Sequence, residues 1–328
     1  MALLSRWHVH ADDYAKEAME NTDMQIKKVW DDSIERGKQW ANELGVSFEE
    51  NIDNVMKDDD IDAIIVTTST NLHPEIIRKA CQYKKHIYTE KVLALTVEES
   101  EEIWKAKLES NVQLMVSLPR LTEKEFLCAE DVVEKGLLGK ITMIRCRLAH
   151  DGAVTRGGEK IGWLPDRFYD KQLAGGGALV DLGAHPIYLT NRLMGNPTSV
   201  YAHLQSLSDQ YEVDDSAVVT VEYESGAIGI IETSFLSHGS PFQLELYGTE
   251  GTFLAEEGKV KIKRKQHQDD GWLELEAPKQ VASPMKQWVD AIQTNSTPTI
   301  TKEDFLQLTV INQAAALSHK QKKRVEIR

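Results

Sequence analysis

Two short segments carry side chains that could take part in proton transfer. Glu90 and Lys91 follow an apolar, strand-like run, and Asp181 and His185 lie four residues apart in a glycine-rich segment. A lysine at the carboxyl end of a buried strand could help a substrate hydroxyl lose its proton. On a helix, positions i and i+4 share a face, so Asp181 and His185 could act on one substrate. The simpler interpretations are an exposed loop lysine and a structural Asp–His hydrogen bond. Pro186 predicts a kink or a late start of this helix.

The hexapeptide S-R-W-H-V-H that begins at Ser5 stands where a dinucleotide would place its phosphates. The glycine pattern G-x-G-x-x-G expected there is absent. A hydroxyl, the Arg6 guanidinium and imidazoles could donate to phosphate instead; alternatively, this turn binds nothing and Trp7 only packs. His8 and His10 also have the character of metal ligands, but no third ligand follows at a suitable spacing, so we expect no bound metal.

Asp31 follows the second predicted strand, 26 residues after Ser5. A carboxylate at this position accepts hydrogen bonds from the adenosine ribose and repels a 2′-phosphate. We therefore predict NAD as the cofactor, with NADP as the alternative because Arg36 lies one turn further on. The other interpretation is that Asp31 and Asp32 form a solvated pair that only caps the next helix.

The elements that must position these residues alternate between strand and helix. Apolar runs predict strands at 2–5, 26–30, 63–68, 86–89 and 112–117, and amphipathic segments predict helices at 11–20, 33–44 and 97–110, with a further helix starting near Pro74. Ser33 is the expected N-cap of the second helix and Gly45 its stop. Strands separated by helices build βαβ units with right-handed crossovers. Residues 1–118 are thus predicted to form an α/β Rossmann-type domain with a doubly wound parallel sheet.

After Pro119 the pattern changes. We predict a helix at 122–135, an alternating strand at 141–148, strand-like segments from 199 to 276 with a hairpin turn at 224–226, and helices at 284–294 and 302–318. This pattern is typical of an α+β domain with a large, mostly antiparallel sheet. Residues 119–328 are expected to form a substrate-binding and oligomerisation domain, whose C-terminal segment could pack back on the first domain.

Composition excludes several classes of protein. The chain of 328 residues is 41% hydrophobic, which is enough for a large core and about two domains. Its net charge of −14 opposes binding to nucleic acids and anionic membranes. Three scattered cysteines, the absence of a signal peptide and the short apolar runs predict a cytoplasmic protein with reduced thiols and no membrane helix.

The whole chain resembles the Gfo/Idh/MocA oxidoreductases, the group of glucose-fructose oxidoreductase and inositol dehydrogenase. The segment I-Y-T-E-K-V at 87–92 is similar to the family's E-K-P segment, with Val92 in place of proline. The segment A-G-G-G-A-L-V-D-L-G-A-H at 174–185 resembles G-G-G-x-x-x-D-x-G-x-H. Residues 114–120, 134–141 and 284–325 match in order and spacing. The S-R-W-H-V-H turn resembles a branch of the family with S-x-x-H-x-H at this place.

This resemblance implies a Rossmann domain, a C-terminal sheet domain often used for oligomerisation, an NAD(P) cofactor, and hydride transfer at a sugar- or polyol-like carbon. It places Lys91, Asp181 and His185 in the substrate site. We accordingly predict an NAD(P)-dependent oxidoreductase acting on a secondary alcohol or ketone of a sugar, sugar acid or inositol. His185 would be the general base, Lys91 would polarise the same oxygen, and Asp181 would orient the histidine or bind a neighbouring hydroxyl.

The residues predicted to bind the cofactor lie in the first turn and at the strand ends: Ser5, Arg6, Trp7, His8, Asp31, Thr67, Thr68, Ser69, His73, Glu90 and Lys91. Candidate substrate contacts are Arg120, His150, Arg156 and Trp163. The expected partners are a polyol or sugar and further copies of the chain, as a homodimer or homotetramer. Two alternatives stay open: a non-catalytic nucleotide- or sugar-sensing regulator, and reduction of an imine or C=C bond on the same scaffold.

Overall fold

The computed structural model describes residues 1–155, 162–265, 271–278 and 280–327. They form two compact units. The first comprises residues 1–117 and 283–301, and the second comprises 118–282 and 302–327 of the described chain. Within the described ranges, none of the helices combines the length and the apolar character that crossing a bilayer requires. Arg156, one of the expected substrate contacts, lies outside the described residues.

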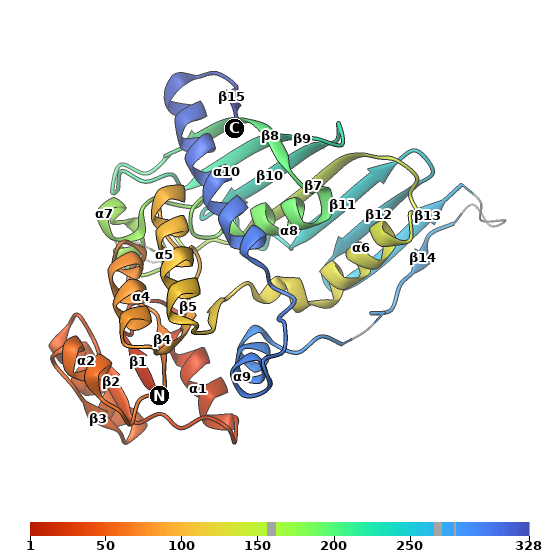
Figure 1. Ribbon diagram of the computed structural model, residues 1–328. Helices are drawn as coiled ribbons and strands as arrows, with labels where there is room; N and C mark the ends of the chain where they lie inside the picture. Colours follow the sequence, from red (N-terminus) through yellow and green to blue (C-terminus); the bar gives the residue numbers. More distant parts are fainter. Residues whose placement is uncertain (156–161, 266–270, 279, 328) are drawn as a thin grey trace. The chain divides into compact units, whose positions relative to one another are not determined.

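The first unit is built on a parallel sheet with the strand order β3-β2-β1-β4-β5-β6. This is a doubly wound sheet, as the sequence predicted. Its strands are β1 (Ala2–Leu4), β2 (Lys28–Trp30), β3 (Ser47–Phe48), β4 (Ala63–Val66), β5 (His86–Thr89) and β6 (Leu114–Val116). Its helices are α1 (Ala11–Glu20), α2 (Ile34–Leu44), α3 (Ile52–Lys57), α4 (His73–Gln82), α5 (Val97–Ser110) and α9 (Pro284–Thr294). Helices α1 and α9 lie on one side of the strands, and α4 and α5 on the other (Figure 1).

Local chemistry explains these elements. All four residues of β4 are buried, as expected for a strand covered on both faces. Helix α2 begins after Ser33, whose hydroxyl accepts the amide of Arg36, and it ends at Gly45 with a φ of 68°, as predicted. Helix α9 packs in this unit through aromatic side chains: the ring of its Trp288 lies 5.6 Å from the ring of Tyr88 in β5.

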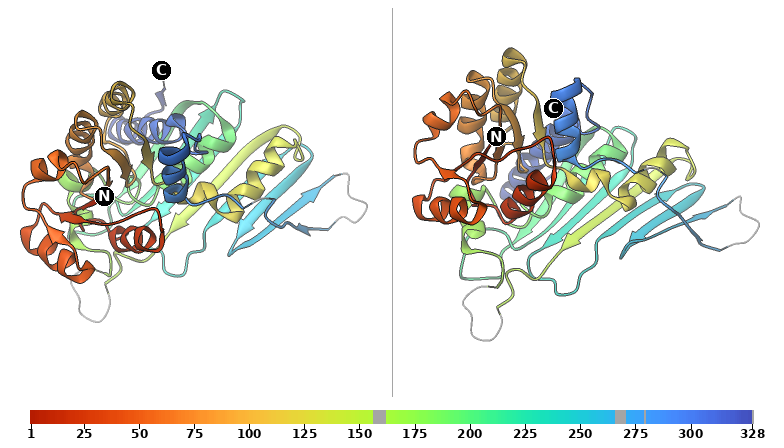
Figure 2. Two further views of the ribbon diagram at one scale, coloured as in Figure 1. Left: turned by 60° about the horizontal axis from the view of Figure 1, so that its bottom comes forward. Right: turned by 90° about the horizontal axis from the view of Figure 1, so that it is seen from below.

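The second unit contains a sheet with the strand order β14-β13-β12-β11-β7-β10-β9-β8-β15. Its strands are β7 (Ile141–Ala149), β8 (Pro197–Gln205), β9 (Ser216–Tyr223), β10 (Ile228–Ser234), β11 (Gln243–Gly248), β12 (Gly251–Glu256), β13 (Lys259–Arg264), β14 (Leu273–Glu274) and β15 (Val325–Glu326). The sheet is mostly antiparallel, as expected, and β10 pairs with β7 in parallel. Helices α6 (Lys124–Glu134), α8 (Ala184–Met194) and α10 (Lys302–Gln321) cover one face of it (Figures 1 and 2). The short helix α7 spans Lys171–Ala174.

The helix expected to carry both Asp181 and His185 starts later than the i, i+4 interpretation requires. Helix α8 begins at Ala184, and Asp181 lies in the turn before it. Pro186 is the third residue of the helix, a position where its missing N–H costs no intrahelical hydrogen bond. The prediction that Asp181 and His185 share one helix face is therefore wrong, and the late start indicated by Pro186 is correct.

Candidate active site

Polar residues gather at the carboxyl edge of the parallel sheet in the first unit. Ser5 follows β1, Asp31 follows β2, Thr67 follows β4, and Glu90 follows β5. Parallel neighbours end at the same edge, and in open α/β sheets this edge is where ligands bind. The tertiary structure thus brings together the positions that the sequence predicted for a cofactor.

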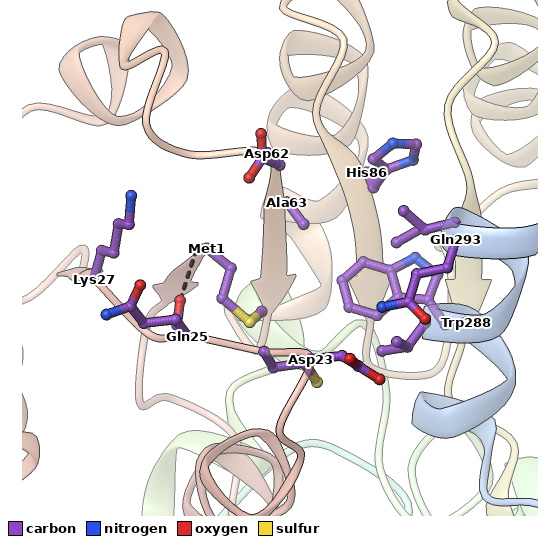
Figure 3. A pocket seen from close by; sticks show the side chains of 12 residues that line it. Met1, Asp23, Gln25, Lys27, Asp62, Ala63, His86, Trp288 and Gln293 are labelled. Atoms are coloured by element: carbon purple, nitrogen blue, oxygen red, sulfur yellow. Dashed lines mark hydrogen bonds between the residues drawn. The ribbon is translucent and has the colours of Figure 1, made fainter.

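A cavity of about 480 Å³ opens at the opposite edge of the same sheet (Figure 3). It is lined by Met1 before β1, by Ala63 and His86 at the first positions of β4 and β5, and by Trp288 of α9. None of the residues predicted to act in catalysis or to bind the cofactor lines it. We therefore place the candidate site at the carboxyl edge.

The first turn adopts the backbone of a glycine turn without the glycine. Ser5 has a φ of 74°, in the left-handed region that normally favours glycine. Three successive amides of the turn donate to acceptors within the first unit: Arg6 to Asp31 Oδ2 (2.7 Å), Trp7 to Ser5 Oγ (3.2 Å) and His8 to the Thr67 carbonyl (3.0 Å). Amides that could donate to a diphosphate are therefore engaged by the protein itself.

Asp31 is buried and fully engaged. Its Oδ2 accepts from the Arg6 amide and from Arg36 Nε, and its Oδ1 accepts from the Ser33 amide and from Arg36 Nη2. The neighbouring Asp32 side chain is 36% exposed, and it also accepts from Arg36 and from the Ser5 hydroxyl. Asp32 is thus the carboxylate of this pair that solvent can reach.

Two buried polar atoms near the end of β4 have no hydrogen-bond partner within the described part of the chain. They are Thr68 Oγ1 and His73 Nε2. The other ring nitrogen of His73 lies 3.0 Å from the Val92 carbonyl, and burial lowers the pKa of the imidazole to about 4, so His73 is neutral near pH 7. Because buried polar groups are normally paired, these atoms fit a site that receives polar groups of a ligand such as a dinucleotide.

Glu90 is held beneath the edge of the sheet by a buried network. Its carboxylate accepts from the Tyr14 hydroxyl and, at 2.8 Å, from the Lys91 amide. The Tyr14 hydroxyl also lies 2.8 Å from Ser117 Oγ. Burial, with the nearby Glu90 charge, raises the pKa of Tyr14 well above its usual value, so the phenol stays a donor. Tyr14 was missed in the sequence because it lies on the apolar face of a predicted helix, where a tyrosine indicates core packing. The Lys91–Val92 peptide bond is cis.

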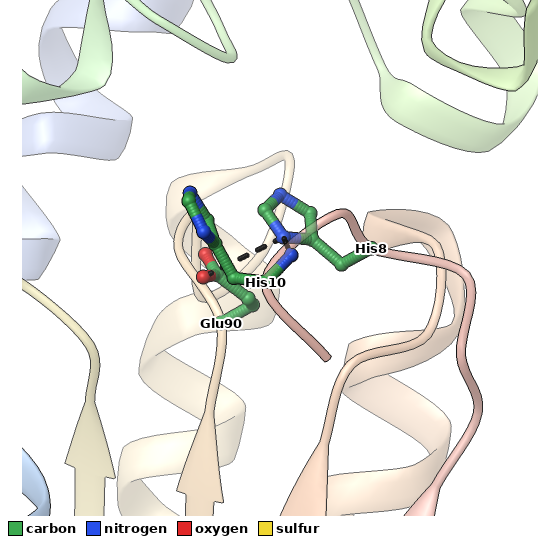
Figure 4. A group of neighbouring side chains, drawn as sticks. All are labelled: His8, His10 and Glu90. Atoms are coloured by element: carbon green, nitrogen blue, oxygen red, sulfur yellow. Dashed lines mark hydrogen bonds and ion pairs between the residues drawn. The ribbon is translucent and has the colours of Figure 1, made fainter. Parts of the chain in front are cut away.

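His8, His10 and Glu90 form a cluster at this edge (Figure 4). One potential ligand atom from each lies within 4.8 Å of the others. The expectation of no metal depended on the absence of a third ligand near the histidines in sequence. Glu90 comes from the end of β5, so far from the histidines in sequence that their spacing could not identify it as a ligand.

The glycine-rich motif of the second unit is fixed by Asp214. A Cβ on Gly177 would lie 1.9 Å from the Asp214 carbonyl oxygen, so no larger residue fits without a shift. The carboxylate of Asp214 accepts the amides of Gly177 and Leu179 at 3.0 and 2.8 Å. Burial raises the pKa of this carboxyl group. The motif is therefore a rigid turn that leads the chain into Asp181 and helix α8.

His185 is oriented by Tyr188 in the same helix. Its Nδ1 lies 2.8 Å from the Tyr188 hydroxyl, which also accepts the Arg120 amide at 3.3 Å. Burial raises the pKa of Tyr188 well above its usual value, so the phenol stays neutral. The sequence analysis gave Asp181 two possible roles, to orient the histidine or to bind a neighbouring hydroxyl, and did not identify Tyr188. The i, i+3 spacing of His185 and Tyr188 is the signal that could have identified Tyr188.

The expected substrate contacts of the second unit fall into separate local groups. The His150 ring stacks on the Phe235 ring with 5.1 Å between the ring centres. The Trp163 ring lies 4.8 Å from the His150 ring. The Trp163 indole is exposed and donates to Asp151. The Arg120 guanidinium lies over the Phe242 ring and pairs with Glu123 at 2.9 Å. The structure thus brings His150 and Trp163 together and engages the Arg120 head group with protein partners.

Comparison with known proteins identifies the family to which both parts of the chain are similar. Residues 7–118 match the family described as "Oxidoreductase family, NAD-binding Rossmann fold", and residues 126–254 match "GFO/IDH/MocA C-terminal domain". A scyllo-inositol 2-dehydrogenase (NAD(+)) of Bacillus subtilis is 31% identical over 67% of this chain and 62% of its own, less than two thirds of that relative. A 1,5-anhydro-D-fructose reductase of Ensifer adhaerens is 26% identical over 92% of each chain.

Solved structures share the fold of the whole chain. Levoglucosan dehydrogenase in complex with NADH and levoglucosan superimposes with a TM-score of 0.85 at 22% identity, over 99% of this chain and 98% of the other. GenD2 from gentamicin A biosynthesis, in complex with NAD, gives 0.85 at 23% identity, over 100% and 96%. At these identities the likeness concerns the architecture.

Proposed function

Because the chain belongs to the Gfo/Idh/MocA family of NAD-binding oxidoreductases, we propose that it transfers a hydride between a nicotinamide cofactor and a secondary alcohol or ketone of a sugar, sugar acid or inositol. The observation that carries this proposal is the pairing of His185 Nδ1 with the neutral Tyr188 hydroxyl. That contact holds an imidazole at the start of α8, in the segment that resembles the family's G-G-G-x-x-x-D-x-G-x-H.

NAD, the cofactor proposed, accepts or donates the hydride when bound. The residues that would hold it are those at the carboxyl edge of the first unit. Thr68 Oγ1 and His73 Nε2, which have no hydrogen-bond partner within the described residues, would pair with polar groups of the cofactor. The accessible carboxylate of Asp32 would accept hydrogen bonds from the ribose. Ser5, Arg6, Trp7, His8, Thr67 and Ser69 shape the surrounding turn and strand end.

The chain's own residues would move one proton. With the ring proton on Nδ1, which then donates to the Tyr188 oxygen, His185 would take the proton of the substrate hydroxyl at Nε2. The Lys91 ammonium would stabilise the oxygen as its negative charge develops. Asp181 precedes α8, and we propose that it binds a neighbouring substrate hydroxyl, one of the two roles that the resemblance leaves open. In the reverse reaction the same nitrogen returns the proton.

The test is a screen of inositols, anhydrosugars, aldoses and sugar acids for NADH formation, with NAD and NADP as cofactors. Turnover of at least one polyol or sugar, lost in His185→Ala, is the expected result. Absence of turnover with every substrate, despite measurable NAD binding, would contradict the proposal.

A non-catalytic nucleotide sensor is the second candidate. The specific observation in its favour is that the Arg6, Trp7 and His8 amides are engaged within the protein. The same screen separates the two functions, since a sensor binds the nucleotide and forms no NADH.

A further inference from the structure

We propose that His8, His10 and Glu90 form a binding site for one divalent first-row transition cation, of which Zn²⁺ is the test case. The three residues supply two imidazoles and one carboxylate, a donor set found in zinc sites with three protein ligands and an open position. The site does not depend on the proposed hydride transfer, because its ligands are defined by the cluster alone.

The distances within the cluster suit a small cation. His8 Nδ1 lies 3.6 Å from Glu90 Oε1. Two ligands of a tetrahedral Zn²⁺ with bonds of about 2.0–2.1 Å lie roughly 3.4 Å apart. All three ligand atoms lie within 4.8 Å of one another, so a shift of roughly 1 Å or less would bring them to this spacing. The His10 side chain is 49% exposed and can make this adjustment. The His10 amide donates to His8 Nδ1 at 3.3 Å, a long bond that coordination through Nδ1 would replace.

Neighbouring groups already orient the ligands. Asp13 Oδ2 lies 3.0 Å from His10 Nδ1, which keeps that nitrogen as the donor and leaves Nε2 for a cation. The Tyr14 hydroxyl and the Lys91 amide donate to Glu90 and fix its carboxylate. Metal-binding histidines and carboxylates commonly have such partners.

The charges around the cluster would favour a bound cation at this position. The first turn of α1 carries Asp12 and Asp13, whose charges oppose an anion at the helix N-terminus. The nearby Arg6 guanidinium is engaged by Asp12 and Glu43. A divalent cation on the His8–His10–Glu90 cluster would add positive charge close to the N-terminus of α1, opposite in sign to Asp12 and Asp13. If the proposed function holds, the cation should strengthen binding of the NAD diphosphate.

The site is tested with Co²⁺ as a spectroscopic probe and Zn²⁺ in calorimetric titration, both without nucleotide. We expect one equivalent bound by the full chain. His10→Ala and Glu90→Gln should each weaken binding by at least about tenfold, the size of effect seen when a metal ligand's support is lost. His203→Ala, which removes an exposed histidine elsewhere, is the matched control. Because His10 is exposed, its variant should keep the parent melting temperature.

Absence of one-equivalent binding, or equal binding by the parent and the ligand variants, would overturn the proposed site. The role in cofactor binding rests on the proposed function and has its own measurement. NAD is titrated into the parent with and without saturating Zn²⁺, and at least about tenfold tighter binding is expected from the added charge. An unchanged NAD affinity would overturn this role, whereas failure of hydride transfer would leave the Co²⁺ result intact.

Discussion

Arg36 holds both carboxylate oxygens of Asp31, with Nη2 2.6 Å from Oδ1 and Nε 3.0 Å from Oδ2. This pair stands at the end of β2, where dinucleotide-binding folds recognise the adenosine ribose. As long as they are charged, Asp31 and Asp32 neutralise the Arg36 guanidinium, which could otherwise bind a 2′-phosphate. The pairing therefore supports NAD over NADP.

Asp31→Asn is expected to shift the ratio of NADP to NAD affinity toward NADP by about tenfold, because Arg36, then paired with Asp32 alone, can make charge-assisted hydrogen bonds to phosphate. Calorimetric titration with both nucleotides measures the ratio. Adding Arg36→Ala to this variant should remove the gain. An unchanged ratio in Asp31→Asn would show that Arg36 does not face the cofactor.

Substitution of the proposed base should separate catalysis from folding. His185→Ala is expected to lower turnover by about 10²–10⁴-fold with NAD affinity nearly unchanged. Tyr188→Phe should lower kcat by roughly tenfold with little change in KM, because the imidazole loses the group that orients it. Asp181→Asn, in our assignment, should raise KM more than it lowers kcat. Turnover and melting temperature are measured on the same preparations, and full specific activity of His185→Ala would refute the mechanism.

His73 should make the first unit sensitive to acid. In the unfolded chain the imidazole takes up a proton near its ordinary pKa of 6.5, whereas burial keeps it neutral in the fold down to about 4. Below pH 6.5 the unfolded state therefore binds more protons, and the free energy of unfolding falls as the pH drops toward 4. At about pH 5 the loss from this residue amounts to about 2 kcal/mol.

His73→Asn keeps a donor for the Val92 carbonyl and cannot titrate. Urea unfolding at about pH 7 and about pH 5 compares parent and variant, so that the other titrating groups cancel. The stability advantage of the parent should shrink by about 2 kcal/mol at the lower pH. A pH-independent difference would show that His73 is not the responsible group.

Self-association is predicted through the face of the nine-stranded sheet opposite α6, α8 and α10. Tyr201, Val218 and Ile228 are exposed on this face. The strand pairing places Arg145 of β7 on the same face as Tyr201 of β8. Arg145 forms ion pairs with Glu232 and Glu245. Apolar side chains with charges of both signs suit a two-fold contact with a second copy. Ile228→Glu should convert the associated protein to monomer in light scattering. Leu317→Glu, at an exposed leucine of α10, is the control that should leave association intact. A monomeric parent at micromolar concentration would contradict the prediction.

The amino-acid sequence by itself determined the two kinds of architecture, because the signals involved act over a few residues. The buried run of β4, the Ser33 cap and the Gly45 stop each depend on neighbours within one or two turns, and the structure has all three as predicted. The order of strands and helices then predicts the parallel sheet, since right-handed crossovers leave few alternatives.

The detailed site was decided by the tertiary structure. Glu90 meets His8 and Tyr14 only because β5 ends at the same sheet edge at which α1 begins, a relationship between residues some 80 positions apart that no local spacing encodes. The full engagement of Asp31 likewise follows from where α2 presents Arg36. Tyr188 is the exception, because its i, i+3 spacing from His185 is local and is present in the sequence. Local periodicity specifies which segments become helix or strand, whereas hydrogen-bond partners depend on distances of a few ångström that only packing sets.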